Sequence, residues 1–340
     1  MIHQGIVRFR PIFAIYFINV TCYYNDSIDH LTSICRRIVA DSSLDRPCRR
    51  PRAHMQTELK YPRLSQFSHR RAIITGAAAG LGRAMALELA RDGWTLLLVD
   101  QDADGLASLQ RETQRPDDVC VLDVTESAKL RDAINDFCSR MDGVDLLVNS
   151  AGVGLAGYAD DYSEADWRKL FDVNVVAVGC ASATVLPFMK KANSGRILNI
   201  ASAAAYHCLP WLGPYSASKA AVVALTENLV AELADTNIKP AVMISAFFKS
   251  SMPKYTLGGS LTASRTSGLM KLSTMTSEDA AVETLKGLER GGTYIIIGSQ
   301  ARLIYRLKRF APALWFRLAP KIARKAFAAA DTAALEPAGP

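Results

Sequence analysis

The chain has 340 residues, of which 49% are hydrophobic, so it can bury a sizeable core in one large domain or two smaller ones. It contains no run of eighteen apolar residues, so the sequence predicts no transmembrane helix. The seven cysteines are odd in number, scattered and without a C-x-x-C pair, which argues against a disulfide framework or a zinc site and indicates a reducing, cytoplasmic compartment.

The formal net charge of +7 is unevenly distributed along the chain. Counted from the sequence, residues 1–71 carry +7 and residues 302–325 carry +8, whereas the long stretch 72–301 carries −6. A nucleic-acid-binding core is usually basic, so we expect no nucleic-acid partner for this acidic central block. The two basic ends need separate explanations.

Residues 1–70 are interpreted as an N-terminal extension. The first 54 residues are rich in arginine and cysteine and have no steady hydrophobic period. Two interpretations are open: a targeting segment, or an over-extended start with Met55 as the first residue of the biological chain. We favour the second and expect the extension to be poorly ordered.

From residue 71 to residue 300, short apolar runs alternate with longer amphipathic stretches. Runs that are apolar throughout are typical of strands buried on both faces, and their alternation with helices is typical of βαβ units in a parallel sheet. We therefore predict one α/β domain, a doubly wound Rossmann fold whose parallel sheet has about seven strands. The expected strands are 72–75, 95–99, 119–122, 145–148, 196–200, 240–248 and 293–298.

The first strand–helix junction, ITGAAAGLGRAMA, contains Gly76, Gly80 and Gly82. Glycines here allow a tight turn and a close approach of the backbone to a phosphate, which the helix N-terminus attracts. Glycines alone could merely close a turn, but Asp100 ends the next strand, where a carboxylate can bind both hydroxyls of a ribose and repel a 2′-phosphate. Arg83, the nearby cation, fits a surface position on the helix. We expect NAD as the cofactor, with NADP as the alternative.

Further motifs follow in order: a strand-end Asp-Val pair, NSAG, a helical asparagine, a serine after a strand, and Y-x-x-x-K. Together with TGxxxGxG they resemble the short-chain dehydrogenase/reductase family from about residue 70 to 250, roughly half the chain. The resemblance implies a catalytic set without a metal, made of Asn174, Ser202, Tyr215 and Lys219. It implies a cofactor site formed by Thr75, Gly76, Gly80, Leu81, Gly82, Asp100, Asp123, Val124, Asn149, Gly152, Tyr215, Lys219 and Ser250.

Tyr215 and Lys219 are four residues apart, which places them on one face of a helix. A free tyrosine is a poor base at neutral pH because its pKa is about 10. An ammonium about 4 Å away favours the phenolate, so we expect Lys219 to lower the pKa of Tyr215 and let it act as general base or general acid. Ser202 would hold the substrate oxygen, and the resemblance gives Asn174 a water-relay role. Taken alone, a tyrosine near a helix start is usually a packing residue, a lysine four residues later is usually solvated, and Asn174 could bond the local backbone.

One stretch departs from the family pattern. Where the family has a Pro-Gly pair after the sixth strand, this sequence has Ser245 and Ala246, while Ser250 keeps the expected hydroxyl. Alanine has a Cβ and avoids positive φ, so we expect an altered cofactor geometry or affinity. The following segment, 253–271, is predicted to be a mobile lid with glycine hinges at 258 and 259. Its apolar residues, with the methionine that precedes it, would be Met252, Tyr255, Leu257 and Leu261.

Residues 301–340 are interpreted as a basic amphipathic tail. Apolar residues recur there at helical spacing, and eight basic residues without an acid accompany them between 302 and 325. Pro312 and Pro320 are expected to break the tail into short helices. Two interpretations stay open: a helix that packs on its own domain or on a second subunit, or an interfacial helix that binds the surface of a membrane.

Two classes of function are compatible with this sequence. The first is an NAD-dependent oxidoreductase for a secondary alcohol or ketone, whose apolar lid and basic tail suggest a lipid-, steroid- or retinoid-like substrate. An NADPH-dependent 3-oxoacyl-type reductase is the alternative within this class, disfavoured by Asp100. The second class is a non-catalytic dinucleotide-binding protein, which would have no need of Ser202, Tyr215 and Lys219 together. We expect a homo-oligomer, a dimer or a tetramer.

Overall fold

The computed structural model describes the chain from residue 69 to 335 with short gaps. The described ranges are 69–115, 117–207, 209–257, 267–271 and 273–335, with Leu64 and Phe67, and with side chains as far as Lys325. The chain divides into two units, Met1–Gln56 and Thr57–Pro340, and every described residue belongs to the second. The expected start at Met55 and nearly all of the expected extension lie outside the described residues, as do Gly258, Gly259 and Leu261 of the predicted lid.

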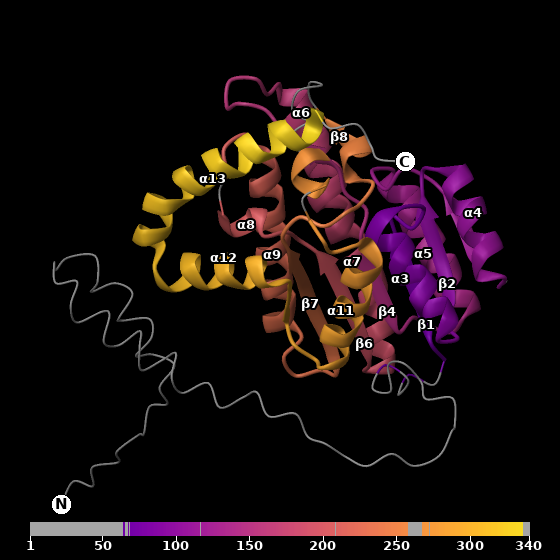
Figure 1. Ribbon diagram of the computed structural model, residues 1–340. Helices are drawn as coiled ribbons and strands as arrows, with labels where there is room; N and C mark the ends of the chain where they lie inside the picture. The colour runs from indigo at the N-terminus through magenta and orange to yellow at the C-terminus, as the bar shows by residue number, and fades with distance from the viewer. Residues whose placement is uncertain are drawn as a thin grey trace, which may run out of the picture. The chain divides into compact units, whose positions relative to one another are not determined.

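Seven parallel strands form the central sheet in the order β3-β2-β1-β4-β6-β7-β9 (Figure 1). The strand order runs outward in both directions from β1 and β4, which is the doubly wound arrangement that the sequence predicts. The strands are β1 Arg71–Thr75, β2 Thr95–Asp100, β3 Asp118–Val121, β4 Leu146–Asn149, β6 Gly195–Ile200, β7 Ile238–Ser245 and β9 Tyr294–Ile297. A separate parallel pair joins β5 Gly154–Leu155 to β8 Thr256–Leu257.

Helices cover both faces of the sheet. Helices α3, α4 and α11 share one hydrophobic cluster with the strands, and α5, α7 and α9 pack in clusters on the other face. The helices up to the last strand are α3 Gly80–Arg91, α4 Ala103–Thr113, α5 Ser127–Arg140, α6 Glu164–Phe171, η2 Asp172–Val176, α7 Ala177–Ala192, α8 Ala204–His207, α9 Gly213–Glu232, η3 Met252–Tyr255 and α11 Ser277–Glu289. After the last strand follow α12 Ser299–Phe310 and α13 Pro312–Leu335.

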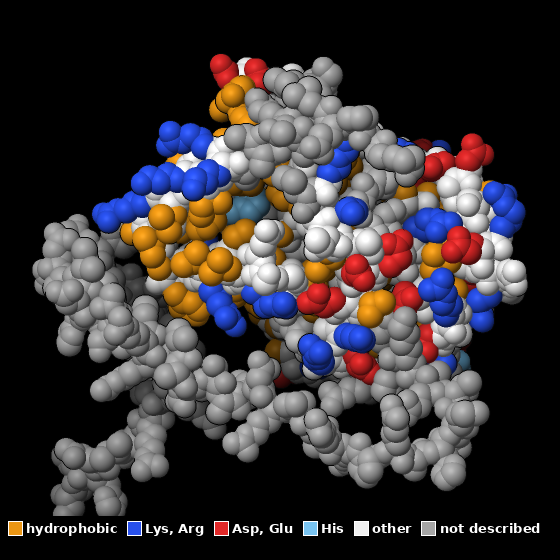
Figure 2. Space-filling model, in the orientation of Figure 1, with side chains coloured by type: hydrophobic (Ala, Val, Ile, Leu, Met, Phe, Trp, Pro, Cys, Tyr) orange, Lys and Arg blue, Asp and Glu red, His pale blue; other side chains and the backbone are white. Residues whose placement is uncertain are grey.

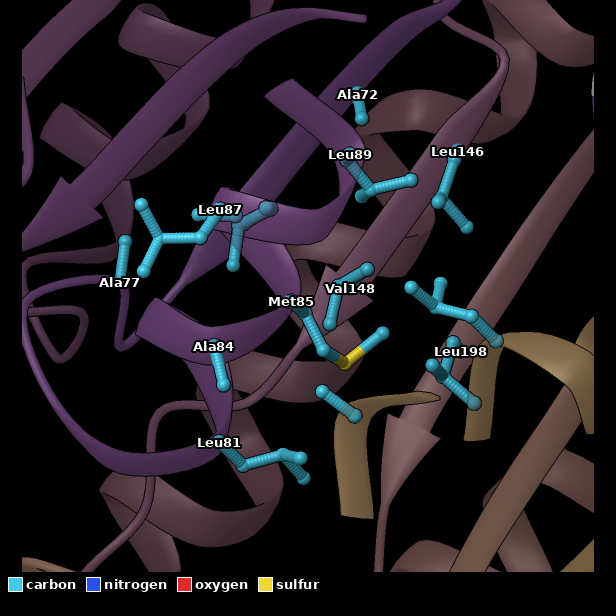
Figure 3. Packing of buried hydrophobic residues seen from close by; sticks show 14 of the residues in the cluster. Ala72, Ala77, Leu81, Ala84, Met85, Leu87, Leu89, Leu146, Val148 and Leu198 are labelled. Atoms are coloured by element: carbon cyan, nitrogen blue, oxygen red, sulfur yellow. The ribbon is translucent and has the colours of Figure 1, made fainter. Parts of the chain in front are cut away.

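The inner strands of the sheet are mainly apolar because alternate residues enter different cores. In β1, Ala72 and Ile74 belong to the cluster that contains α3, whereas Ile73 belongs to the cluster that contains α5 and α7. Figure 3 shows the first of these clusters, where Met85 of α3 lies beside Val148 of the sheet. Burial on both faces therefore explains why the strands do not alternate between apolar and polar residues.

A buried ion pair connects the beginnings of β1 and β4. The Arg71 guanidinium donates to both carboxylate oxygens of Asp145 at 3.0 Å, and the Arg71 backbone N–H donates to one of them at 2.9 Å. Both side chains are less than a tenth exposed. Such a pair is tolerated in a core because every charge has a partner, and losing one partner leaves the other charge buried alone.

The tail forms two helices rather than several short ones. Pro312 is the first residue of α13, where its missing N–H is not needed. Pro320, in contrast, lies inside α13, so the predicted break at this residue is wrong. The buried residues Ala319 and Ala323 on either side of it explain the difference, because tertiary packing stabilises the helix through the proline.

The helical run Glu164–Ala192 is long and apolar enough to cross a membrane by length and composition, which the sequence did not lead us to expect. The run comprises α6, η2 and α7, and 44% of its most apolar window is buried. Its residues Ala181 and Val185 belong to the hydrophobic cluster shared with the sheet. Packing in the core of the domain accounts for the apolar character of this run.

Candidate active site

The carboxyl ends of the parallel strands border a cavity of about 410 Å³. Ligands of open α/β sheets bind at this edge, where the strand order reverses. The β5–β8 pair and η3 also contribute to the lining of the cavity. The lining residues that directly follow or end a strand include Gly76, Asp100, Ser150, Ala201 and Ser245.

Three glycines shape the turn between β1 and α3, for two different reasons. Gly76 and Gly80 have φ angles of +69° and +53°, in the left-handed region that favours glycine. A Cβ on Gly82 would lie 2.1 Å from the carbonyl oxygen of Gly76, so only glycine fits there. Gly80 and Leu81 begin α3 and line the cavity, which places the N-terminus of a helix, an anion-binding element, at its edge.

Three of the predicted cofactor-site residues are not part of the cavity wall: Thr75, Gly82 and Asn149. Thr75 Oγ1 accepts a hydrogen bond from the Ala151 N–H at 3.2 Å and so joins the ends of β1 and β4. Asn149 is buried in the sheet, where its Nδ2 donates to Ser182 Oγ at 3.2 Å and to Asn199 Oδ1 at 2.8 Å. Thr75 thus holds the backbone after β4, and Asn149 connects β4 to α7 and β6 through its side chain.

Asp100 lines the cavity at the end of β2. Its Oδ2 accepts from the Ala78 N–H at 2.9 Å, and its Oδ1 accepts from the Asp102 N–H at 3.0 Å. Each carboxylate oxygen can accept a further hydrogen bond, so capacity remains for two ribose hydroxyls. Arg83 forms an ion pair with Glu112 at 2.7 Å, which matches the surface position expected for it.

Asp123 and Val124 line the same cavity after β3. Asp123 Oδ1 accepts from the Thr125 N–H at 2.9 Å, a local bond that shapes the turn. Ser250 lies on the wall as well, and its Oγ accepts from the Met252 N–H at 3.4 Å. All three positions are thus brought to the cavity that the glycine turn borders.

The short helix η3 adds two residues whose place in the site the sequence did not reveal. Lys254 lines the cavity, and a loop lysine gives no sequence signal because it is ordinarily solvated. Tyr255, expected only as an apolar part of a lid, also lines it. Burial first, and then the carboxylates of Asp100 and Asp102, raise the pKa of the Tyr255 phenol, so this ring lies near the Asp100 end of the cavity.

Tyr215 and Lys219 project from the first two turns of α9 into the cavity wall. The Lys219 Nζ lies 5.8 Å from the centre of the Tyr215 ring and donates to the Ile200 carbonyl at 2.9 Å. The Tyr215 side chain is hydrogen bonded to Ser202, whose Oγ also accepts from the Ala204 N–H at 3.1 Å. The structure therefore brings the three predicted residues together from α9 and from the segment that follows β6.

Asn174 lies in η2, a π-helical turn, a distortion that often occurs at functional sites. Its Oδ1 accepts from the Val153 N–H at 2.9 Å, and its Nδ2 donates to the Val153 carbonyl at 3.0 Å and to Ser218 Oγ at 3.1 Å. A Cβ on Gly152 would lie 3.3 Å from Asn174 Oδ1 and 3.5 Å from Lys219 Nζ. Both side chains therefore lie close to Gly152, and Asn174 Oδ1 keeps one lone pair for a further donor.

The electrostatics of this cluster differ from the expectation. Burial raises the pKa of Tyr215 to about 12, and the hydrogen bond from Ser202 offsets only part of that rise. Burial likewise lowers the pKa of Lys219 to about 8. The pKa of Tyr215 is therefore raised in this structure rather than lowered as expected, because burial of the phenol outweighs its hydrogen bond with Ser202.

Ser245 and Ala246, which replace the Pro-Gly pair, both line the cavity at the end of β7. The Ser245 carbonyl accepts from the Ala203 N–H at 2.7 Å, so this turn is tied to the residue after Ser202. Ala246 is not among the described non-glycine residues with positive φ. The backbone here follows a course that alanine adopts without strain.

The wall near Tyr215 is mostly apolar. His207 also lines the cavity there, but burial lowers the pKa of its imidazole to about 4, so it is neutral at pH 7. Its backbone carbonyl accepts from the Trp315 Nε1–H at 3.2 Å, which connects α13 to α8. Within the described residues, no group of three or more His, Cys, Asp and Glu could hold a metal ion. The apolar lining residues are Leu155, Ala156, Leu212, Met252 and Leu257.

Comparison with known proteins gives one family. The family model for short chain dehydrogenase matches residues 70–257. The 3-oxoacyl-[acyl-carrier-protein] reductase FabG of Thermotoga maritima is 31% identical over 183 residues, which cover 53% of this chain and 74% of that protein. The 2-dehydro-3-deoxy-L-rhamnonate dehydrogenase (NAD(+)) of a Sphingomonas species is 33% identical over 186 residues, 54% of this chain and 74% of that protein. A short chain dehydrogenase/reductase from Burkholderia phymatum, solved in complex with NAD, shares 27% identity and a TM-score of 0.66 over 72% of this chain and 94% of that one.

Proposed function

The chain belongs to the short-chain dehydrogenase family, and from this premise we propose that it is an NAD-dependent oxidoreductase that interconverts an apolar secondary alcohol and its ketone. One observation carries the proposal: Ser202, Tyr215 and Lys219 are assembled on the wall of a cavity that the glycine turn also borders. The residues fit a dinucleotide, because the glycine turn and the N-terminus of α3 border the cavity and the Asp100 carboxylate lines it. When bound, the nicotinamide exchanges a hydride with the alcohol carbon.

The proton is handled by the chain's own residues. Tyr215 gives its phenolic proton to the ketone oxygen during reduction and takes it back from the alcohol during oxidation. Ser202 donates a hydrogen bond to the same substrate oxygen and orients it toward Tyr215. Lys219, with a pKa near 8, is mostly protonated at pH 7 and favours the phenolate form during the reaction. Asn174 positions a water beside Lys219 through the remaining lone pair of its Oδ1.

NAD is the proposed cofactor because the Asp100 carboxylate lines the cavity and Arg83 is engaged by Glu112. Replacing Asp100 by alanine should reduce kcat/KM with NAD by about tenfold and raise it with NADP, since a ribose acceptor and a repulsive charge are lost together. Steady-state kinetics with both cofactors would measure this. Asp123→Ala is a suitable comparison, because Asp123 also lines the cavity but its Oδ1 accepts from the Thr125 N–H of the same turn. A wild-type enzyme that prefers NADPH contradicts the assignment.

An NADPH-dependent reductase of 3-oxoacyl type is the second candidate. Lys254 favours it, because this cation lines the cavity and could pair with a 2′-phosphate. The similarity to the Thermotoga reductase also favours it. Lys254→Gln separates the two: loss of NADPH-dependent turnover supports the reductase, whereas unchanged NAD-dependent turnover supports the dehydrogenase.

The apolar substrate class follows from the lining of the cavity near Tyr215, where Leu155, Leu212 and Leu257 are the large side chains. A panel of secondary alcohols of increasing apolar size, including lipid-, steroid- and retinoid-like members, tests it by absorbance of the reduced nicotinamide. We expect kcat/KM to rise with apolar area until the cavity is full. A protein that binds NAD but turns over none of the panel is better described as a non-catalytic dinucleotide-binding protein.

We further propose a homo-oligomer, a dimer or tetramer, in the cytoplasm. Trp167 and Val176 are exposed along α6 and η2, where a second copy could cover them. Cys120, Cys138 and Cys180, the cysteines that the structure describes, are free thiols, which suits a reducing compartment. Light scattering after size-exclusion chromatography measures the oligomeric state, and a monomer at micromolar concentration contradicts it.

A further inference from the structure

The C-terminal helices are attached to the domain by a small set of buried contacts. Trp315 is 2% exposed and donates to the His207 carbonyl, and Ala301 is buried where α12 packs near β9. Arg302 pairs with Glu283 of α11 at 3.1 Å. These contacts hold the two helices in place, so their outer face is a surface of the folded domain.

That outer face is unusually apolar. The described residues include eleven large hydrophobic side chains that are exposed, and six of them lie on these two helices. Phe310 is 70% exposed and Leu303 is 59% exposed, and the others are Leu314, Phe316, Leu318 and Ile322. Figure 2 shows hydrophobic side chains gathered at the left of the molecule, where Figure 1 draws α12 and α13. Exposed apolar patches of this kind mark interaction sites.

The same face is strongly basic. Eight Lys and Arg residues and no acid occur between residues 302 and 325, and Figure 2 shows Lys and Arg side chains above and below the hydrophobic group. Lys308 Nζ lies 3.9 Å from the centre of the Phe316 ring, so cations and apolar anchors are interleaved rather than segregated. Apolar anchors flanked by cations are what a helix in the headgroup region of a bilayer requires.

We propose that the α12–α13 face is a docking surface for an anionic lipid bilayer. The positive charge of the face and its exposed apolar side chains favour this partner over a second copy, the N-terminal residues or a nucleic acid. A twofold contact between two copies would set two copies of the 302–325 segment against each other, each with seven cations left after Arg302 pairs with Glu283, and residues 1–71, with +7, would be repelled in the same way. A nucleic acid would leave Phe310 and Leu303 without an apolar environment. An anionic bilayer satisfies the cations at the headgroups and the apolar side chains below them.

Docking would also place the substrate end of the cavity beside the lipid. The link is Trp315, which bonds to His207, and His207 lines the cavity near Tyr215. An apolar alcohol dissolved in the bilayer would then reach the site without crossing much water. This second step rests on the proposed function, whereas the docking itself does not.

The docking is tested with the full chain, because a truncation would remove the buried Trp315. Co-sedimentation uses vesicles of phosphatidylcholine alone and of phosphatidylcholine mixed with phosphatidylserine, at low and high salt. We expect binding to the mixed vesicles only, released by salt. The triple variant Arg317→Gln, Lys321→Gln, Arg324→Gln should weaken binding by on the order of 100-fold at low salt. The matched control Lys129→Gln, Arg131→Gln, Lys191→Gln removes three exposed cations elsewhere and should bind like the wild type.

A second variant, Phe310→Ser with Leu314→Ser, removes two exposed anchors and should also weaken binding while the thermal unfolding profile stays unchanged. Equal binding to neutral vesicles, no binding at all, or full binding by both variants overturns the proposal. Absence of vesicle binding together with a smaller oligomer in the Phe310→Ser, Leu314→Ser variant would assign the face to a contact between copies.

Entry of the substrate from the bilayer, called the entry step here, has its own test. The kcat/KM for an apolar alcohol should rise when the alcohol is presented in mixed vesicles, and only in chains that bind them. Vesicle binding without that rise overturns the entry step alone, and absence of turnover in every condition refutes the proposed function while leaving the docking intact.

Discussion

The cavity wall around Tyr215 and the outer face of α12 and α13 break the ordinary rule of burial in opposite directions. At the cavity, Lys219 and Asn174 are buried although they are charged or polar. On the C-terminal helices, Phe310 and Leu303 are exposed although they are apolar. A buried polar group and an exposed apolar patch are the informative exceptions in a folded protein. Removing a polar group from water and exposing apolar surface to water are both unfavourable in the protein without a ligand. These exceptions are the observations on which the proposed cofactor site and the proposed docking surface rest.

The largest effect is expected from Tyr215→Phe, which keeps the buried ring and deletes its proton. Turnover should fall by about 10²- to 10⁴-fold, the usual contribution of general acid–base catalysis, while NAD binding measured by calorimetry persists. Tyr206→Phe is the matched control, because Tyr206 is a partly buried tyrosine of α8 that packs on Tyr305. Near-normal turnover in Tyr215→Phe would show that the cluster around Tyr215 has a structural role only. The cavity wall would then no longer be an example of polar groups buried for catalysis.

Asp145→Ala tests a buried charge that lies outside the cavity. It leaves the Arg71 guanidinium buried without its carboxylate and should lower the free energy of unfolding by about 3–5 kcal/mol, measured by urea denaturation. Turnover per folded molecule should not change. Glu164→Ala, which removes an exposed partner of Arg168, should have little effect on stability. A large loss of turnover in folded Asp145→Ala would mean that the Arg71–Asp145 pair affects catalysis and is not purely structural.

Lys219 makes the stability of the protein depend on pH. Its pKa is lowered by burial from 10.5 to about 8, so between these values the unfolded chain holds a proton that the folded chain has released. The free energy of unfolding should therefore rise with pH from about 8 to 10.5, by on the order of 3 kcal/mol relative to Lys219→Met, and the contribution is lost as the pH falls through 8. Chemical denaturation of both chains across this range measures it. Parallel curves would mean that Lys219 is solvated rather than buried.

The smallest effect is expected at the attachment of α13. Trp315→Phe removes the bond to the His207 carbonyl and should lower the free energy of unfolding by about 1 kcal/mol, read from thermal unfolding. Its exposed neighbour gives the contrast, since Leu314→Ser should leave stability unchanged but weaken binding to anionic vesicles. If the two variants behave alike, the helices do not have the separate inner and outer faces that the comparison assumes.

Local chemistry alone determines much of the candidate site. The spacing of Tyr215 and Lys219 places them on one helix face in any α-helix, and Gly76 and Gly80 fit a turn that needs positive φ. Most of the strands are recognisable in the sequence because burial on both faces requires continuous apolar runs, whereas the edge strand β3 leaves Val119 and Val121 exposed. Whether the cofactor-site residues bind NAD is still a prediction, and the structure shows Asn149 donating to Asn199 in the neighbouring strand.

Other properties are decided by contacts between residues far apart in the chain. The pKa of Tyr215 rises rather than falls, because burial depends on the whole wall and not on the lysine one turn away. Pro320 stays inside a helix, because Ala319 and Ala323 are packed. Lys254 reaches the cavity, and Trp315 meets His207 across 108 residues of sequence. A local pattern specifies dihedral angles and faces, whereas desolvation and packing are sums over neighbours that only the folded chain brings together.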